Sequence, residues 1–178
     1  MADPVAITGT YAVDTMHTIP MFEIRHLGLS HYVARFKKVS GTVILDAEKK
    51  TGSAEIIIDA ASVSTELAEF DGHLKGKDYL DVEQYPTITF KAGKFKFDGD
   101  KVVEIAGDLT MHGVTKPVTF KVSGFVCIPH HFRKVPACGA DASATIKRTD
   151  WGVVGPYPPP LVAEEMKLRI LIEGYKTA

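Results

Sequence analysis

The sequence predicts an all-β protein, either an antiparallel barrel or a sandwich of about eight strands. Apolar and polar residues alternate with a period of two along most of the chain, and β-branched and aromatic residues are frequent in these runs. Turn motifs separate the runs: Thr-Gly at 51–52, Asp-Gly at 98–99 and His-Gly at 112–113 predict reversals of the chain. The length of 178 residues fits one domain, so residues 1–178 are expected to form a single domain.

The alternation is clearest in four segments, 22–26, 54–59, 118–122 and 166–173. In 118–122, two valines and a phenylalanine alternate with a threonine and a lysine, so one face is apolar and the other is polar. This pattern is typical of a strand that is buried on one side only.

Segment 87–97 changes phase at Gly93. The apolar residues before this glycine share one face, whereas Phe95 and Phe97 lie one step out of register. A glycine at such a slip is typical of a β-bulge that bends the strand.

One segment has a helical pattern instead. Thr65 is a suitable residue to cap a helix start, and acidic residues follow it in the first turn. Leu67, Phe70 and Leu74 have the spacing of one helical face. Gly76 is a plausible end. We therefore expect a short helix that lies across the sheet with this apolar face inward.

Parity along the strands predicts which side chains face the interior of a closed sheet. The predicted inward set is apolar: Phe22, Ile24, Val43, Leu45, Ile56, Ile58, Ile88, Phe90, Phe120, Val122, Leu168 and Ile170. An eight-stranded barrel is wide enough either to be filled by its own side chains or to hold one slender ligand. A solid core and an apolar cavity are both open alternatives on parity alone.

Sequence motifs of enzymes are absent: there is no nucleophile elbow, phosphate-binding loop, dinucleotide fingerprint or zinc-protease motif. A histidine near an aspartate, such as His17 near Asp14, could form an acid–base pair, but a lone histidine is more often a structural residue. We therefore predict no catalytic residues.

Cys127 and Cys138 lie in two segments that would face each other in a hairpin, which would place the cysteines opposite one another. A disulfide and free thiols are equally compatible with this pattern, because hairpin register cannot be derived from the sequence. A zinc site with His130 and His131 is a weaker alternative, since the spacing matches no common zinc module. We predict no metal site.

The net charge of -1, without a basic block, argues against nucleic acid as a partner. No apolar run approaches the roughly 20 residues that span a bilayer, so no transmembrane segment is expected. The start at residues 1–4 has no export signal, which fits either a cytoplasmic protein or a mature exported chain with an added initiator methionine.

From about residue 10 to 175 the chain resembles the YceI-like family, lipocalin-like proteins of bacterial periplasms, several of which bind polyisoprenoid lipids. The motifs occur in the family's order. They are Tyr11 to Asp14 with His17, Phe22 to His26 with Phe36 and Gly41, Ser62 to Thr65, His73-Leu74, Asp78 to Asp81 with Tyr85-Pro86 and Phe90, Gly107 to Thr110, Gly113 to Val118, and Arg148 to Gly152. The segments 127–138 and 155–160 depart from the family pattern and are expected to border a cavity mouth.

This resemblance implies an extended eight-stranded antiparallel lipocalin-like barrel with a short helix packed against it. It also implies an elongated cavity for an isoprenoid lipid or quinone, with the polar head near one mouth. The ligand-binding set becomes Phe22, Ile24, His26, Phe36, Val43, Leu45, Ile56, Ile58, Leu74, Tyr79, Leu80, Ile88, Phe90, Phe120, Val122, Leu168 and Ile170. His17, His26, His73 and Asp78 match motif positions and would either orient a head group or, by preference, fix the helix to the barrel.

The family further implies a periplasmic or secreted protein whose signal peptide has been removed, which favours the disulfide, and in many members a homodimer. The leading hypothesis is a non-enzymatic protein that sequesters or carries an isoprenoid lipid and needs no catalytic cofactor. The alternatives are a secreted scavenger of lipophilic small molecules such as antibiotics, and a metal- or redox-linked module built on the cysteine–histidine hairpin.

Overall fold

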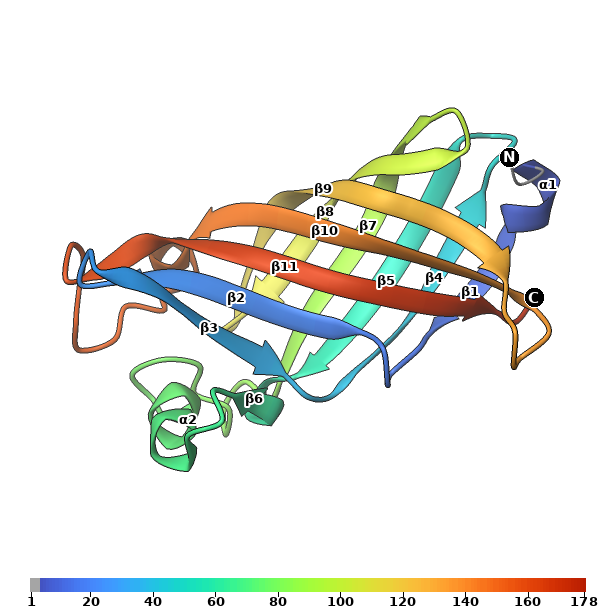
Figure 1. The fold of residues 1–178 in the computed structure, drawn as a ribbon. Helices are drawn as coiled ribbons and strands as arrows, with labels where there is room; N and C mark the ends of the chain where they lie inside the picture. The colour runs from blue at the N-terminus through green and yellow to red at the C-terminus, as the bar shows by residue number, and fades with distance from the viewer. Residues whose placement is uncertain (1–3) are drawn as a thin grey trace.

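The computed structural model describes residues 4–178, so Met1, the added initiator methionine of the exported-chain hypothesis, lies outside the described residues. One antiparallel sheet dominates it (Figure 1). The strands are β1 (Gly9–Val13), β2 (Ile19–His26), β3 (Ser30–Phe36), β4 (Val39–Asp46), β5 (Thr51–Asp59), β6 (Val63–Ser64), β7 (Thr87–Asp98), β8 (Lys101–Met111), β9 (Val114–Pro129), β10 (Pro136–Lys147) and β11 (Val162–Lys176). The helical elements are α1 (Pro4–Ile7), α2 (Ala68–Lys75) and the 3₁₀ turns η1 (Ala60–Ser62) and η2 (Arg148–Trp151). No helix in residues 4–178 is long and apolar enough to cross a membrane.

The sheet closes into a ring because β1 pairs with both β4 and β11. The ring order is β1-β4-β5-β7-β8-β9-β10-β11, which makes eight antiparallel strands. Strands β2, β3 and β6 continue this sheet from β11. Since β1 and β2 pair with successive parts of β11, they act as one long strand interrupted at 14–18. The predicted all-β barrel with one short packed helix is confirmed.

The predicted bulge at Gly93 is confirmed, because the register of β7 against β8 shifts between Ala92 and Lys94. The predicted reversals at 98–99 and 112–113 are also confirmed. Both residues of the second turn have positive φ, 53° for His112 and 73° for Gly113, as a tight two-residue hairpin requires.

The predicted reversal at 51–52 is wrong. The chain turns at 47–50 instead, and Lys50 takes the left-handed conformation with φ of 55°. Gly52 lies within β5 for a different reason. A Cβ atom there would lie 2.5 Å from the ring of Phe95, so the glycine permits a close approach of that ring.

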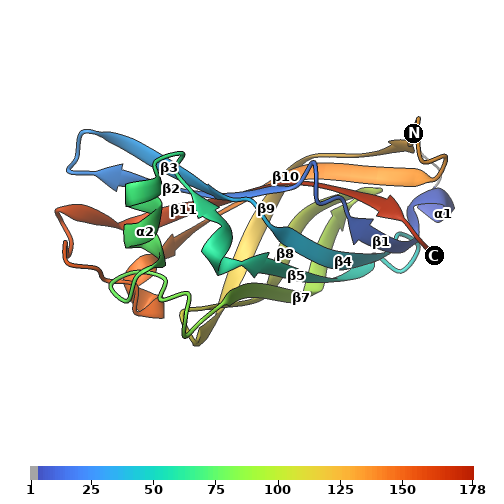
Figure 2. The same ribbon diagram turned by 90° about the horizontal axis from the view of Figure 1, so that it is seen from below.

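Helix α2 begins at Ala68, two residues later than a cap at Thr65 would place it. Thr65 is engaged elsewhere, because its backbone N–H and hydroxyl donate to the Asp71 carboxylate at 2.6 and 2.7 Å. Leu67 precedes the helix and is 61% exposed, so its predicted inward position is wrong. Gly76 ends the helix as expected. In both ribbon views α2 lies at the end of the barrel formed by the β2–β3 turn (Figure 2).

The motif at 148–152 forms the turn η2 between the last two strands. Trp151 is buried there, and its indole N–H donates to the carbonyl of Leu109 at 3.1 Å. Nδ1 of His112 lies 3.1 Å from the carbonyl of Trp151, within hydrogen-bonding distance. The indole therefore fixes the β10–β11 connection onto β8.

A disulfide joins Cys127 and Cys138 at directly paired positions of β9 and β10. Both sulfur atoms are in this bond, so neither is free as a thiolate for the zinc alternative. The hairpin turn beyond the disulfide lies at the same end of the barrel as α1 and the C-terminus (Figure 1). We call this the disulfide end, and the opposite end the α2 end.

Removal of the disulfide should lower stability without changing the fold. The bond closes a short loop with a sequence separation of 11 residues. In the chain-entropy treatment, a loop of this length contributes about 3 kcal/mol. We expect a Cys127→Ala/Cys138→Ala variant to lose about that much unfolding free energy in urea titrations. Equal stability of the variant and the oxidised wild-type protein would contradict this expectation.

Candidate ligand cavity

The barrel encloses an elongated cavity of about 220 Å³. Thirty residues line it, and all but five of them are apolar. Fifteen of the seventeen predicted ligand-binding residues lie on this lining. They are Phe22, Ile24, His26, Phe36, Val43, Ile56, Ile58, Leu74, Tyr79, Leu80, Ile88, Phe90, Phe120, Leu168 and Ile170.

A second cavity of about 80 Å³ continues toward the disulfide end. The two remaining predicted residues, Leu45 and Val122, line this second cavity. Phe95 and Cys138 lie beside them. The bulge at Gly93 explains how Phe95 reaches this lining, because it shifts the side-chain alternation of β7 by one step. Val43, Ile105, Ala142 and Ile172 line both cavities, so the two are adjacent along the barrel. We call the two together the lumen.

The interior is hollow along this line rather than filled by its own side chains. Phe22, Phe90 and Leu168 point into the barrel, yet each is only partly buried. Among residues 6–178, no large side chain is fully buried. The inner faces of these side chains contact the cavity instead of other atoms. Phe90 and Phe120 pack edge to face with ring centroids 5.0 Å apart, which leaves their remaining faces toward the lumen.

Sequence reasoning missed several lining residues. They are Pro20, Met21, Tyr32, Ala54, Ile105, Leu109, Met111, Ala142, Arg148, Val153, Val162, Met166, Arg169 and Ile172. Phe70 also lines the cavity, as its predicted place on the inward face of the helix suggests, although it was not among the predicted ligand-binding residues. The same parity rule could have found Ile105, Leu109 and Met111, which share one face of β8 beyond a glycine-containing stretch. Small residues such as Ala142 do not produce a clear alternation of large apolar and polar side chains, although β10 forms part of the wall of the lumen.

The polar groups of the larger cavity belong to His26, Tyr32, Tyr79, Arg148 and Arg169. His26 ends β2 and is exposed at the α2 end. The ring of Tyr32 packs on the ring of Phe70 in α2, with centroids 5.0 Å apart. Arg169 forms an ion pair with Glu23 at 3.7 Å. The polar part of the lining is therefore concentrated near the α2 end, and the remainder is hydrocarbon.

Arg148 is a buried cation that forms no ion pair with a carboxylate among residues 4–178. It is 2% exposed, and all five of its N–H groups donate to backbone carbonyls. The acceptors lie in the segment 153–163, which comprises the β10–β11 loop and the first two residues of β11: Val153, Val154, Tyr157, Val162 and Ala163. Burial lowers the pKa of Arg148, which the charges of Tyr79 and Glu164 partly oppose. Because no N–H is left over, Arg148 holds the loop and cannot donate to a ligand.

Tyr79 completes this end of the cavity. A Cβ atom at Gly155 would lie 2.5 Å from the Tyr79 ring, so the glycine lets the segment 153–163 cross the ring closely. Gly155 also has a φ of 69°, which favours glycine. Burial raises the pKa of Tyr79, so its hydroxyl is neutral at neutral pH. A neutral hydroxyl and a saturated guanidinium offer little acid–base chemistry.

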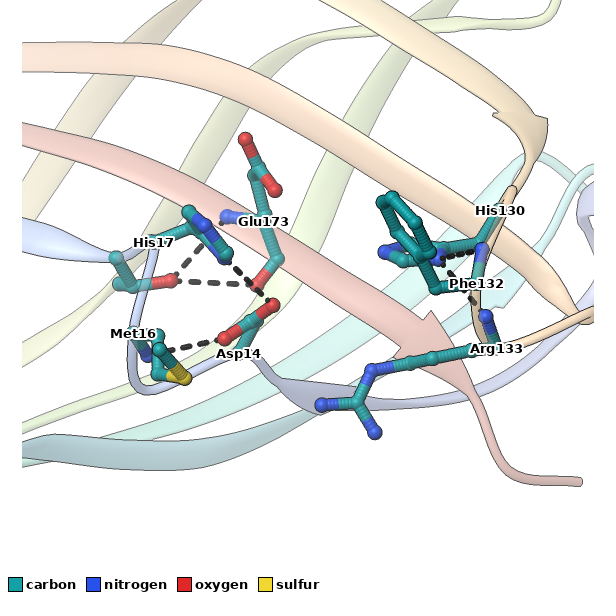
Figure 3. Close-up of polar contacts among 8 residues, drawn as sticks. Asp14, Met16, His17, His130, Phe132, Arg133 and Glu173 are labelled. Carbon is teal, nitrogen blue, oxygen red and sulfur yellow. Dashed lines mark hydrogen bonds and ion pairs between the residues drawn. The ribbon is translucent and has the colours of Figure 1, made fainter.

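His17 does not fix the helix or reach the lumen mouth at the α2 end, contrary to the hypothesis for this motif position. It lies in the connection between β1 and β2, and its Nδ1 is 2.9 Å from Oδ2 of Asp14 (Figure 3). The N–H of Met16 donates to Oδ1 of the same carboxylate at 2.9 Å. The pair therefore organises the interruption between β1 and β2.

Asp14, His17 and Glu173 also bring three donor atoms within 4.8 Å of one another, a set that suits a divalent metal (Figure 3). The imidazole is already engaged with Asp14, so an ion pair accounts for this geometry. Burial opposes ionisation of Asp14, but the hydrogen bonds from His17 and Met16 outweigh it and lower the pKa of Asp14. The hydrogen bond to Asp14 and the charge of Asp14 in turn raise the pKa of His17.

His73 and Asp78 are exposed on α2 and the turn after it. The helix contacts the barrel through Phe70 and Leu74, which line the cavity. These apolar side chains, rather than the two polar ones, account for the position of α2.

Comparison with known proteins gives a family match over nearly the whole chain. The model of the YceI-like domain matches residues 11–174. A "UPF0312 protein" of Pseudomonas syringae pv. tomato is 34% identical over 176 residues, which covers 95% of this chain and 88% of the relative. A "UPF0312 protein" of Pseudomonas putida strain F1 is 35% identical and covers 96% of this chain and 88% of the relative.

Solved structures show the same fold. BcnA of Burkholderia cenocepacia has a TM-score of 0.77 at 24% identity and covers 90% of this chain and 98% of its own. A YceI protein of Campylobacter jejuni has a TM-score of 0.69 at 24% identity, covering 87% and 91%. A polyisoprenoid binding domain of Saccharophagus degradans, implicated in plant cell wall breakdown, has a TM-score of 0.67 at 14% identity, covering 94% and 98%.

Replacement of Arg148 should loosen the segment 153–163. Methionine has similar bulk but would leave the loop carbonyls without donors, and lysine could satisfy at most three of them. We expect Arg148→Met to lower the unfolding free energy by about 3 kcal/mol and Arg148→Lys to lose less. Hydrogen exchange of the backbone N–H groups of 153–163 should rise more in Arg148→Met than in Arg148→Lys. A stable Arg148→Met variant with unchanged exchange would refute this role.

The Asp14–His17 pair should make stability depend on pH in two ranges. His17 has a pKa raised above its usual 6.5, so its contribution is present below pH 6.5 and is lost as pH rises through the raised pKa. Asp14 has a pKa lowered below its usual 3.8, so its contribution is present above pH 3.8 and is lost as pH falls through the lowered pKa. Urea unfolding across pH should show the alkaline loss in the wild type but not in His17→Asn. An identical pH profile for both proteins would count against the pair.

Proposed function

This chain belongs to the YceI-like family, and from that premise we propose that it is a non-enzymatic protein that binds one isoprenoid lipid, a polyprenyl chain or an isoprenoid quinone, in the lumen of its single domain. It sequesters this lipid or carries it through water. The bound lipid is the cargo, and the proposal includes no catalytic cofactor.

The closed apolar lumen carries the proposal. Burial of on the order of 400 Å² of ligand hydrocarbon contributes roughly 10 kcal/mol at about 25 cal/mol/Å². Loss of ligand freedom on binding offsets several kcal/mol of this gain. The remainder supports useful affinity without an ionic contact. The elongated lumen, which runs from His26 at one end to Cys138 at the other, favours a slender chain over a compact ligand.

The orientation of the lipid follows from the distribution of polar groups. A polar head group is best solvated near His26, Tyr32 and Tyr79 at the α2 end. The chain then extends toward Phe95 and Cys138. The fold shared with the polyisoprenoid binding domain of Saccharophagus degradans supports this ligand class.

We place the protein in an oxidising compartment, the periplasm or the exterior of the cell. The Cys127–Cys138 disulfide supports this location, because such bonds are rare in the reducing cytosol. Transport of an apolar chain through an aqueous compartment is the task that a closed lumen performs best.

Extraction of the purified protein with organic solvent, followed by mass spectrometry, tests the function directly. We expect an isoprenoid at up to one molecule per barrel, and uptake of added ubiquinone by delipidated protein. Repeated absence of lipid together with no uptake would overturn the proposal. Equal affinity for unrelated apolar dyes would instead favour the scavenger of lipophilic compounds, since the hydrocarbon lining offers few groups for selection.

Two lumen variants sharpen this test. Phe90→Asp places a charge on the wall and should abolish uptake, whereas Ile44→Asp, on an exposed side chain outside the lumen, should not. Ala142→Phe adds bulk where the two cavities adjoin, so it should retain short-chain quinones and exclude long-chain ones. Unchanged chain-length preference in Ala142→Phe would show that the ligand does not pass this point.

A further inference from the structure

The α2 end of the barrel has an exposed apolar surface that takes no part in binding a lipid in the lumen. Two loops form it: the β2–β3 turn at 27–29 and the loop at 152–161 (Figure 1). They lie side by side, because the N–H of Leu27 donates to the carbonyl of Leu161 at 3.0 Å. We call these two loops the apolar tip.

Large apolar side chains of the apolar tip face solvent. Leu29 is 76% exposed, Tyr157 is 57% exposed and Leu161 is 52% exposed. None of the three lines either cavity, so their apolar character has no role in the walls of the lumen. Exposed leucines grouped at one point of a monomer are typical of an interaction site.

The apolar tip is also without formal charge. Residues 27–30 and 151–163 contain no acidic or basic side chain. The one guanidinium beneath the longer loop, Arg148, is enclosed by five backbone carbonyls. Arg25, an exposed cation just before the β2–β3 turn, donates from Nη2 to the carbonyl of Gly28 at 2.9 Å, which places its charge at the base of the apolar tip. The two loops beyond this base complement a neutral hydrocarbon phase.

The lumen reaches the surface next to the apolar tip. His26 and Val162 line the larger cavity and are paired with each other at the base of the two loops. Phe70 of α2 also lines the cavity and is exposed at this end. A lipid that leaves the lumen here would emerge beside Leu29 and Leu161.

We propose that the apolar tip docks into the surface of a neutral lipid bilayer and that lipid enters and leaves the lumen there. This inference rests on the proposed function, because an isoprenoid chain has its source in a membrane. Insertion of the exposed leucines would bring the lumen mouth against the hydrocarbon layer, so the chain could transfer without crossing water.

The other end of the barrel offers a matched comparison. Phe132 is 91% exposed in the β9–β10 turn, but it lies among the basic residues Arg133 and Lys134. Arg133 stacks on the ring of Tyr175 at 3.7 Å from its centroid. Docking through this turn would require anionic lipid and would weaken with salt. Docking through the apolar tip would need neither.

Flotation with vesicles of neutral phosphatidylcholine tests the proposal. We expect the wild-type protein to float with the vesicles, with little change at about 0.5 M salt. Leu29→Asp/Leu161→Asp should reduce vesicle binding by about tenfold or more, because it removes two apolar anchors and adds two charges. Phe132→Asp should stay within about twofold of the wild type, as an exposed control.

Quinone transfer separates this inference from the proposed function. The double variant should take up detergent-dispersed ubiquinone to the same extent as the wild type, yet exchange it with vesicles about tenfold more slowly. Normal uptake with unchanged vesicle binding would overturn the docking inference alone. Absent uptake with tip-dependent vesicle binding would overturn the proposed function and leave the docking surface in place.

Two other outcomes would also overturn the docking inference. Binding that requires anionic vesicles and is lost in Phe132→Asp would assign the contact to the disulfide end. Sedimentation of the wild type as a dimer and of the double variant as a monomer, with equal vesicle binding, would assign the apolar tip to a second copy of this chain.

Discussion

β11 is the strand on which the closed barrel depends, because it has partners along nearly its whole length. β10 pairs with it through eleven residue pairs on one side. β2 and then β1 follow one another on the other side. Once the ring is closed, the alternation of side chains along each strand sends every second residue inward. The lumen is therefore a consequence of backbone pairing, and its apolar character is a consequence of which residues have the inward parity.

The alternation of inward and outward side chains is a property of each strand by itself. This explains why the walls of the lumen could be predicted from the sequence while the details at its ends could not. Phe22, Ile56 and Phe120 were placed correctly on the inner face, since each belongs to an alternating run. Arg148 was missed as a lining residue because it follows a strand in a 3₁₀ turn, where a period of two no longer applies. Gly52 was misread because glycine serves both turns and close approaches, and only the ring of Phe95 distinguishes the two.

The polar groups near the lumen are occupied mainly with the protein itself. Arg148 gives all its N–H groups to the segment above it, and Arg169 forms an ion pair with Glu23. Selection among ligands would then depend on length and cross-section more than on hydrogen bonding.

The strand pairing that closes the ring differs in extent between the two sides of β11. Three residue pairs join β1 to β11, at Tyr11, Ala12 and Val13, and backbone hydrogen bonds from Asp14 to Glu173 and from Thr177 to Thr10 flank them. On the opposite side of β11, β10 is tied covalently to β9 through Cys138, the residue that pairs with Gly174. Because β10 pairs with β11 over eleven residues and β1 over three, resistance to separation is greater between β10 and β11 than between β1 and β11. A bulky or branched ligand that reached this depth would be accommodated by separation of β1 from β11, because this is the shortest pairing within the eight-stranded ring.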